Sequence, residues 1–257
     1  MSAIEYLESV QSALKGALEE QLDAIHAAAD LWAAAIAGGG LVHLFGSGHS
    51  SLVCQDAYSR AGGLVPVNWI MGEDLLPLRG LRSSMVERLP GLAAVLLDFE
   101  PLRVGDVLVV VSNSGRNAVP VEMAEVGRER GLRTIAITSL RHSQSCSSRA
   151  PSGKRLCEVA DLVLDNMAAR GDAAISIGEG DDNVTMGATS TVTGCAILQA
   201  ISLETAERLI RQGIRPPVFR SANLDNSEEL NLKLLLSLDE RVPSLMAADI
   251  NRLSHVV

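Results

Sequence analysis

Short apolar runs alternate with helical patterns between residues 41 and 212, and this alternation constrains the fold more than any other feature of the chain. Such runs are typical of parallel strands buried on both faces, and parallel strands need a helical crossover between them. The sequence therefore predicts an α/β domain whose mainly parallel, five-stranded sheet is covered by helices on both sides. The expected strands cover residues 41–45, 64–70, 107–111, 133–138 and 162–164.

Helical spacing of apolar residues occurs in three stretches of this region, residues 50–61, 119–130 and 185–212. The apolar run 91–99 fits a helix and a strand equally well. The polar stretch 141–154 predicts a loop.

Ahead of the sheet, apolar side chains recur every three or four residues from Leu7 to Ile36, which predicts one long amphipathic helix. It packs on the domain, on a partner subunit or on both. We divide the chain into this N-terminal helix (1–40), a central domain (41–212) and a C-terminal extension (213–257). Two interpretations of the extension stay open, packing on its own domain and wrapping onto a neighbour's site.

The charge balance is acidic, since 31 Asp and Glu face 22 Lys and Arg and give a net charge of -9. This excludes binding to nucleic acid through a broad basic face, and no apolar stretch is long enough to span a membrane. The four cysteines form no CxxC pair, so neither a metal site nor a disulfide framework is predicted. Without a signal-peptide pattern, we expect a cytoplasmic protein that binds neither nucleic acid nor membranes.

Two strand-to-loop junctions carry small residues and hydroxyls. Residues 46–51 read Gly-Ser-Gly-His-Ser-Ser, and residues 112–117 read Ser-Asn-Ser-Gly-Arg-Asn. Each junction precedes a helix whose free N–H groups and positive dipole end favour an anion. Two such loops on neighbouring parallel strands could enclose one phosphate.

The spacing of these loops argues against nucleotide cofactors. A Walker loop needs a lysine, and none lies between Lys15 and Lys154. A dinucleotide fingerprint needs a third glycine where this chain has Ser51. We therefore predict neither an NTPase nor a nicotinamide enzyme, and no cofactor.

The two loops in this order resemble the sugar isomerase, or SIS, domain family. Its first loop, Gly-x-Gly-x-Ser, is matched by residues 46–50, and its second, Ser-x-Ser-Gly-x-Thr/Ser, by residues 112–117, with Asn117 in place of the last hydroxyl. The overall pattern is most similar to a stand-alone SIS group near the phosphoheptose isomerases.

This resemblance implies a doubly wound, flavodoxin-like sheet, a homodimer or homotetramer, and a phosphorylated sugar or amino sugar bound at the strand ends near a subunit boundary. Arg116 would add positive charge. The residues implied as phosphate contacts are Ser47, Ser50, Ser112, Asn113, Ser114 and Asn117.

The family also implies a cofactor-independent ketose–aldose isomerase that works through an enediol, which needs a base and an acid. Glu73, followed by Asp74, is our candidate base, and His49 is the candidate for polarising a carbonyl or opening the ring. Residues 179–182 form a second acidic group. Hydroxyls at Thr185, Thr189, Ser190 and Thr191 match the family's last long helix at its start.

Two differences from the phosphoheptose isomerases leave other functions open. Arg60 stands where those enzymes have a glutamate, and no histidine lies between His142 and His255, where they carry one in the late helix. The alternatives are a non-catalytic sugar-phosphate sensor that acts through a protein partner, and a sugar-phosphate lyase, etherase or deaminase. We interpret His43, inside a strand, as structural.

Overall fold

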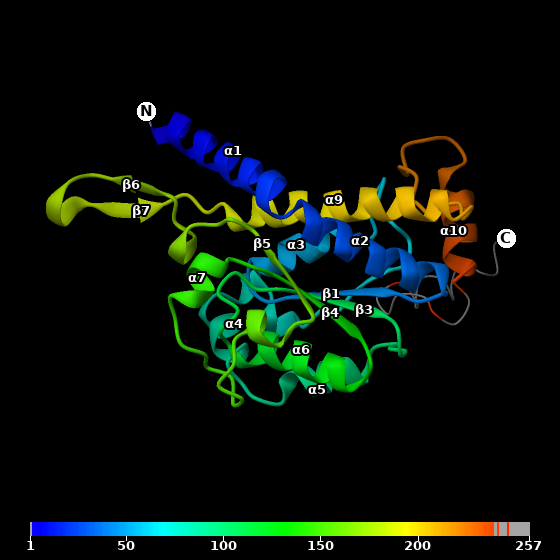
Figure 1. The fold of residues 1–257 in the computed structure, drawn as a ribbon, viewed down its shortest axis with the longest axis horizontal. Helices are drawn as coiled ribbons and strands as arrows, with labels where there is room; N and C mark the ends of the chain where they lie inside the picture. Colours follow the sequence, from blue (N-terminus) through cyan, green and yellow to red (C-terminus); the bar gives the residue numbers. More distant parts are fainter. Residues whose placement is uncertain (1, 239–240, 242–245, 247–257) are drawn as a thin grey trace.

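The computed structural model describes residues 2–238, 241 and 246. Its main sheet holds five parallel strands in the order β2-β1-β3-β4-β5. Figure 1 labels β1, β3, β4 and β5 of this sheet. The predicted α/β class and five-stranded parallel sheet are confirmed. The strands are β1 (Val42–Gly46), β2 (Val67–Trp69), β3 (Val107–Val111), β4 (Arg133–Thr138) and β5 (Leu162–Asp165).

The strand order places the two predicted loops side by side. From β1 the chain first adds β2 on one side and then returns to add β3 on the other, so the sheet reverses its winding between β1 and β3. Gly46 pairs with Val111, and both strands therefore end at the same level. Such a switch point leaves a crevice at the carboxyl ends of the strands, where ligands bind in open α/β sheets.

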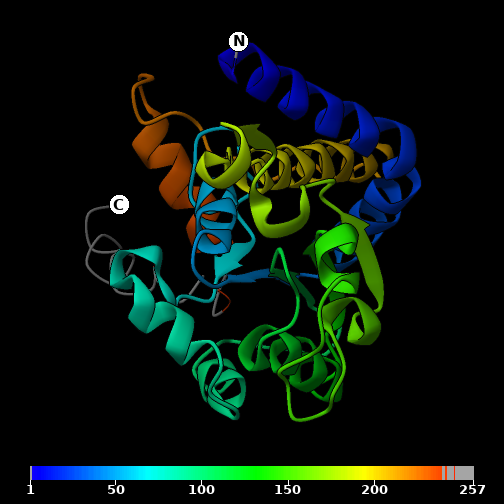
Figure 2. The ribbon, with the colours of Figure 1, turned by 90° about the vertical axis from the view of Figure 1, so that its left-hand side faces the viewer.

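Helices cover both faces of the sheet (Figure 2). Alternating side chains of the strands pack against these two layers. Val107, Val109 and Val111 face one layer, whereas Leu108 and Val110 face the other. The first layer consists of α2 (Leu22–Ala37), α3 (Ser50–Ala57) and α9 (Ser190–Arg211), and the second includes α5 (Leu92–Asp98), α6 (Ala118–Glu129) and α8 (Leu156–Val159).

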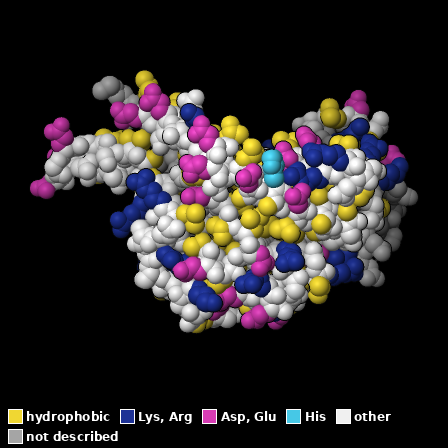
Figure 3. Space-filling view, in the orientation of Figure 1, with side chains coloured by type: hydrophobic (Ala, Val, Ile, Leu, Met, Phe, Trp, Pro, Cys, Tyr) yellow, Lys and Arg dark blue, Asp and Glu magenta, His cyan; other side chains and the backbone are white. Residues whose placement is uncertain are grey.

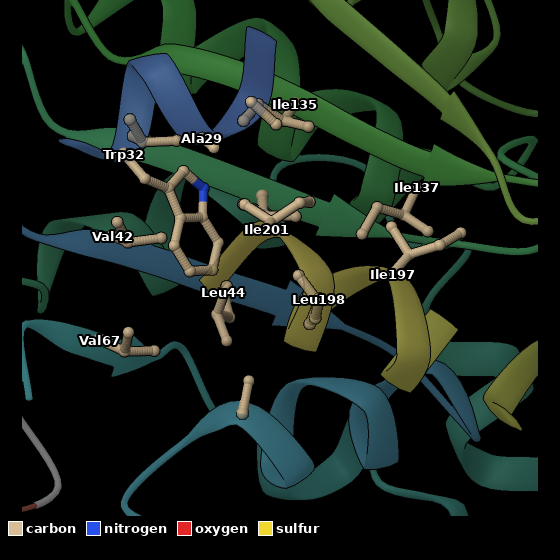
Figure 4. Close-up of a cluster of buried hydrophobic side chains, with 14 of the residues drawn as sticks. Ala29, Trp32, Val42, Leu44, Val67, Ile135, Ile137, Ile197, Leu198 and Ile201 are labelled. Carbon is tan, nitrogen blue, oxygen red and sulfur yellow. The ribbon is translucent and has the colours of Figure 1, made fainter. Parts of the chain in front are cut away.

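Trp32 of α2 lies at the centre of the first layer's core (Figure 4). It is fully buried among β-strand and α9 side chains that include Val42, Leu44 and Ile201. Burial of large side chains on both faces is what fixes the sheet and hence the position of its loops.

The predicted N-terminal helix is present but is divided at Gln21 into α1 (Ser2–Glu20) and α2. The side-chain oxygen of Gln21 accepts a hydrogen bond of 2.9 Å from the N–H of Asp165, at the end of β5. Beyond this break α2 packs on the sheet, whereas α1 leaves the body and buries only Ala17.

The region before α9 differs from the prediction. Residues 185–189 are not helical, because β6 (Ile175–Ile177) and β7 (Val184–Met186) form an antiparallel hairpin that stands away from the body (Figure 1). Gly187, with φ of +87°, separates the hairpin from the helix. The ambiguous run 91–99 is helical as α5, and the expected loop at 141–154 begins with α7 (Leu140–Gln144).

The described part of the C-terminal extension packs on its own domain. The N–H of Val65 donates to the carbonyl of Pro217 at 2.8 Å, and the N–H of Phe219 donates to the carbonyl of Gly63 at 2.9 Å. A helix, α10 (Ser227–Leu236), follows. Among the described residues, none of the helices is both long and apolar enough to cross a bilayer.

Candidate functional site

The two predicted loops meet at one carboxylate, that of Glu87. The hydroxyl of Ser47, in the first loop, donates to Glu87 Oε2 at 2.6 Å. The side-chain amide of Asn117, in the second loop, donates to Glu87 Oε1. Ser47 and Asn117 are both buried, and Glu87 is half-buried. The loops therefore converge on a single anionic group.

Glu87 directly follows α4 (Leu81–Val86). Its carbonyl accepts a hydrogen bond of 3.0 Å from the N–H of Val119 in the first turn of α6, so its backbone is fixed beside the second loop. Sequence reasoning missed this residue because it belongs to neither motif. The available signal was weak: an acidic side chain at a helix C-terminus opposes the helix dipole and needs another reason to be there.

The first loop is a tight turn whose geometry requires glycine. A Cβ on Gly46 would lie 2.6 Å from the carbonyl oxygen of Ser50, and Gly48 has φ of +54°. The N–H of Gly48 donates to the carbonyl of Leu75 at 2.7 Å. Ser50, half-buried, begins α3, and His49 precedes it with an exposed side chain.

The second loop is braced from within and by β4. The hydroxyl of Ser112 accepts a bond of 3.2 Å from the N–H of Gly115, which has φ of +57°. Asn113 is held by Thr138, whose hydroxyl donates to its carbonyl, and by Asn166, whose amide donates to its side-chain oxygen at 3.1 Å. Asn113 thus orients the loop, while the half-buried Ser114 stays at its surface.

Arginines add positive charge beside Glu87. Arg149 Nη1 donates to Asn117 Oδ1 at 3.2 Å, and its backbone N–H donates to the carbonyl of Arg116 at 2.7 Å. Arg149 is exposed, but the loss of some of its hydration, and then the positive charges of Arg116 and Arg88, hold its pKa below the usual range. Arg149 was missed because it lies in the polar stretch 141–154, far from both motifs in sequence.

The predicted catalytic carboxylates lie near the first loop but point to the surface. The bond between Gly48 and Leu75 sets the short 3-10 helix η1 (Glu73–Leu75) against this loop. The Glu73 side chain is 76% exposed and lies 3.9 Å from Arg79. Asp74 pairs with Arg82 at 3.0 Å. The backbone of this segment therefore lies against the first loop, whereas the two carboxylates contact arginines at the surface.

His142, in α7, is a third residue that sequence reasoning missed at this edge. Ser139 caps the helix by accepting from the N–H of His142 at 3.1 Å. His142 Nδ1 is buried without a hydrogen-bond partner. Burial is the main cause that lowers the pKa of His142; the charge of Asp172 opposes it, and those of Arg116 and Arg170 add to it.

The acidic residues 179–182 lie at the end of the β6–β7 hairpin, exposed and away from the body (Figure 3). Thr185 is exposed within β7, and Thr191 is half-buried in the first turn of α9. The Asp172 carboxylate caps α9, since it accepts the N–H groups of Thr189 and Ser190, each at 3.0 Å. Among the residues described, no group of three His, Cys, Asp or Glu side chains could hold a metal ion.

Comparisons with known proteins agree with this architecture. The SIS domain family matches residues 5–139. A UPF0309 protein of Geobacillus kaustophilus is 42% identical over 243 residues, which cover 94% of this chain and 96% of that protein.

Two solved structures share the fold. A phosphoheptose isomerase of Francisella tularensis has a TM-score of 0.55 at 17% identity, over 80% of this chain and 97% of the enzyme. The NanR protein of Vibrio vulnificus has a TM-score of 0.50 at 18% identity, over 82% of this chain and 63% of NanR. The family match covers more than half of the chain and includes both loops, and the relative aligns almost end to end. The chain therefore belongs to the SIS domain family and is a relative of the UPF0309 proteins.

Proposed function

We propose that this protein binds a phosphorylated sugar or amino sugar, with the phosphate held between the β1 and β3 loops. One observation carries the proposal: Ser47 and Asn117, from the two loops, already donate to the oxygens of one anionic group. A phosphate presents three acceptor oxygens and more negative charge than a carboxylate, so the same donors suit it.

The surrounding charge and backbone support this assignment. The helices α3 and α6 begin at the two loops and direct their positive ends there. Ser112, Ser114 and Ser50 are the further hydroxyl donors, and Arg149 supplies a guanidinium at the rim. NanR, which shares the fold, was solved in complex with ManNAc-6P.

For the reaction we propose a cofactor-independent ketose–aldose isomerisation. A base removes a proton from the carbon next to the carbonyl and returns it to the neighbouring carbon, through an enediol. Glu73 is our candidate base, with Asp74 as the second carboxylate and His49 as the group that polarises the carbonyl. The bond from Gly48 to Leu75, which sets this segment against the first loop, supports the choice.

One observation favours a second candidate function, that of a non-catalytic sensor of sugar phosphates. Glu73 and Asp74 face Arg79 and Arg82 on the surface. A base that pairs with arginine outside the loops is not poised for proton transfer.

We also propose a homo-oligomer in the cytoplasm. The exposed leucines Leu14, Leu18 and Leu203 line an apolar groove between α1 and α9, which suits a second copy of the chain. Its four cysteines are unpaired, as is usual in a reducing compartment. Sedimentation equilibrium tests the proposed homo-oligomer, because it measures the mass of the protein in solution.

Binding is tested with a panel of sugar phosphates in a thermal-shift assay. At least one compound should raise the Tm of the wild-type protein. The double variant Ser112→Ala, Ser114→Ala should lose this shift, because the second loop loses both hydroxyls. Ser152→Ala, Ser176→Ala is the matched control, since both of its hydroxyls are exposed and away from the loops. An unchanged shift in the loop variant would refute the proposal.

Chemistry is tested by NMR of the binding compounds in deuterated water. An isomerase exchanges the proton next to the carbonyl for deuterium, and Glu73→Gln should stop this exchange without abolishing binding. Tight binding with no exchange in the wild-type protein would identify the sensor instead.

A further inference from the structure

The free protein already satisfies part of the predicted phosphate site with its own carboxylate. Glu87 accepts from Ser47 on one oxygen and from Asn117 on the other. Its backbone is fixed by the N–H of Val119 at 3.0 Å, so the carboxylate is presented to the loops from a rigid position. A ligand that accepts hydrogen bonds from Ser47 and Asn117 must therefore displace the Glu87 carboxylate.

The competition is unequal for different anions. A carboxylate from solution offers the same two oxygens and the same single charge as Glu87. It also has to compete with a group that is tethered beside the donors at an effective concentration of about millimolar or more. A phosphate dianion has a third acceptor oxygen and a charge of about -1.5 to -2, so it can use donors that a carboxylate leaves unused.

The donors left unused by Glu87 are present. Ser114, half-buried at the surface of the second loop, adds a hydroxyl. Arg149 donates a hydrogen bond to Asn117, and Arg116 and Arg88 are close enough to interact with Arg149 electrostatically. These groups favour the more highly charged anion, since hydrogen bonds between charged partners are about twice as strong as neutral ones.

We propose that Glu87 is a specificity-determining residue, an intramolecular anion that fills the phosphate subsite of the free protein and gives way to phosphate dianions but not to carboxylates. This inference rests on the proposed function and goes beyond it. It gives Glu87 the role of excluding sugar acids and other monoanions from a site whose remaining donors would accept them.

The test is a titration of the full-length protein with inorganic phosphate and, separately, with acetate, at constant ionic strength, followed through backbone amide NMR signals. Glu87→Gln keeps the size of the side chain and removes its charge. Glu129→Gln is the matched control, because it removes the same charge from the far, exposed end of α6. The variant Ser112→Ala, Ser114→Ala reports whether any binding uses the loops.

Glu87→Gln should bind phosphate about tenfold more tightly than the wild-type protein, because the side chain at position 87 no longer competes for the site as an anion. Acetate should perturb the loop amides of Glu87→Gln but not those of the wild-type protein. The control should match the wild-type protein in both titrations.

Two results overturn the inference in distinguishable ways. If the wild-type protein binds phosphate through the loops and Glu87→Gln binds it equally or more weakly, or if acetate binds both proteins alike, Glu87 is not a selective competitor and the phosphate site stands. If neither protein binds phosphate or any sugar phosphate, the proposed function fails and this inference fails with it.

Discussion

Two carboxylates, at opposite edges of the sheet, each accept more than one hydrogen bond from residues distant in the sequence. At the carboxyl edge, Glu87 accepts from two loop side chains. At the amino edge, Asp106 accepts from the N–H groups of Leu41 and Arg103, at 2.9 and 2.8 Å, and from His43 and Arg241, at 3.1 and 2.6 Å. Asp106 is 1% exposed and Arg241 is 5% exposed, whereas Glu87 is half-buried.

Both residues are carboxylates, so the difference lies in their solvent exposure and in the groups that donate to them. A buried carboxylate such as Asp106 stabilises the fold, whereas a half-buried one such as Glu87 occupies donors that a ligand could use. Three of the donors of Asp106 make buried hydrogen bonds: the N–H of Leu41 and the side chains of His43 and Arg241. Asn68 donates to His43 Nδ1 at 3.0 Å, which leaves Nε2–H to donate to Asp106. His43 lies entirely buried in this network, as its prediction as a structural residue requires.

The largest effect that the comparison predicts is on stability at the amino edge. Asp106→Ala should lower the free energy of unfolding by about 3–5 kcal/mol, because it leaves the Arg241 guanidinium and the N–H of Leu41 buried without their acceptor. Urea unfolding measures it.

Asp98→Ala is the matched control for Asp106→Ala, since Asp98 also pairs with an arginine but is 63% exposed, and its loss should cost less than about 1 kcal/mol. Equal costs for the two variants would show that the sealed network does not stabilise the fold.

The second prediction concerns acid. Burial acts to raise the pKa of Asp106, but the hydrogen bonds from His43, Leu41 and Arg103 outweigh it, so the pKa of Asp106 lies below its usual value in the folded protein. Its stabilising contribution is therefore present above about pH 3.9, the unfolded value, and is lost as the pH falls through the folded pKa. Between pH 5 and pH 2 the unfolding free energy of the wild-type protein should fall more steeply than that of Asp106→Asn. Parallel slopes would contradict this.

The smallest effect is expected at the rim of the carboxyl edge. Arg149→Ala should weaken phosphate binding by about threefold to fivefold, as an exposed charge contact usually contributes less than about 1 kcal/mol. Arg128→Ala removes the same charge at the other end of α6 and should leave the affinity unchanged. Equal losses in both variants would mean that overall charge, and not the contact with Asn117, is responsible.

Much of the fold was predictable because local patterns encode it. The strands 107–111 and 133–138 have the predicted bounds, since short runs rich in β-branched residues and bounded by turn residues leave little ambiguity. The loop motifs predict that Ser47 and Asn117 lie close together, because neighbouring parallel strands end at one edge.

The rest depends on contacts between distant segments. Glu87 and Arg149 both contact Asn117, although they lie 30 and 32 residues from it in the sequence. No local sequence pattern predicts these contacts. The break at Gln21 depends on a bond to Asp165, 144 residues away. The hairpin at residues 175–186 was missed because Thr185 of its second strand, close in sequence to Thr189 and Ser190, was interpreted as the beginning of the last long helix.

The central claim is that the carboxyl-edge loops, and not the sealed amino edge, form an anion site. Backbone amide NMR of the wild-type protein during titration with a sugar phosphate from the panel tests it most directly. We predict saturable shifts at residues 47–50 and 112–117 and none at residues 41–43 and 106–107. Shifts confined to the amino edge, or no shift at either loop, would contradict the account.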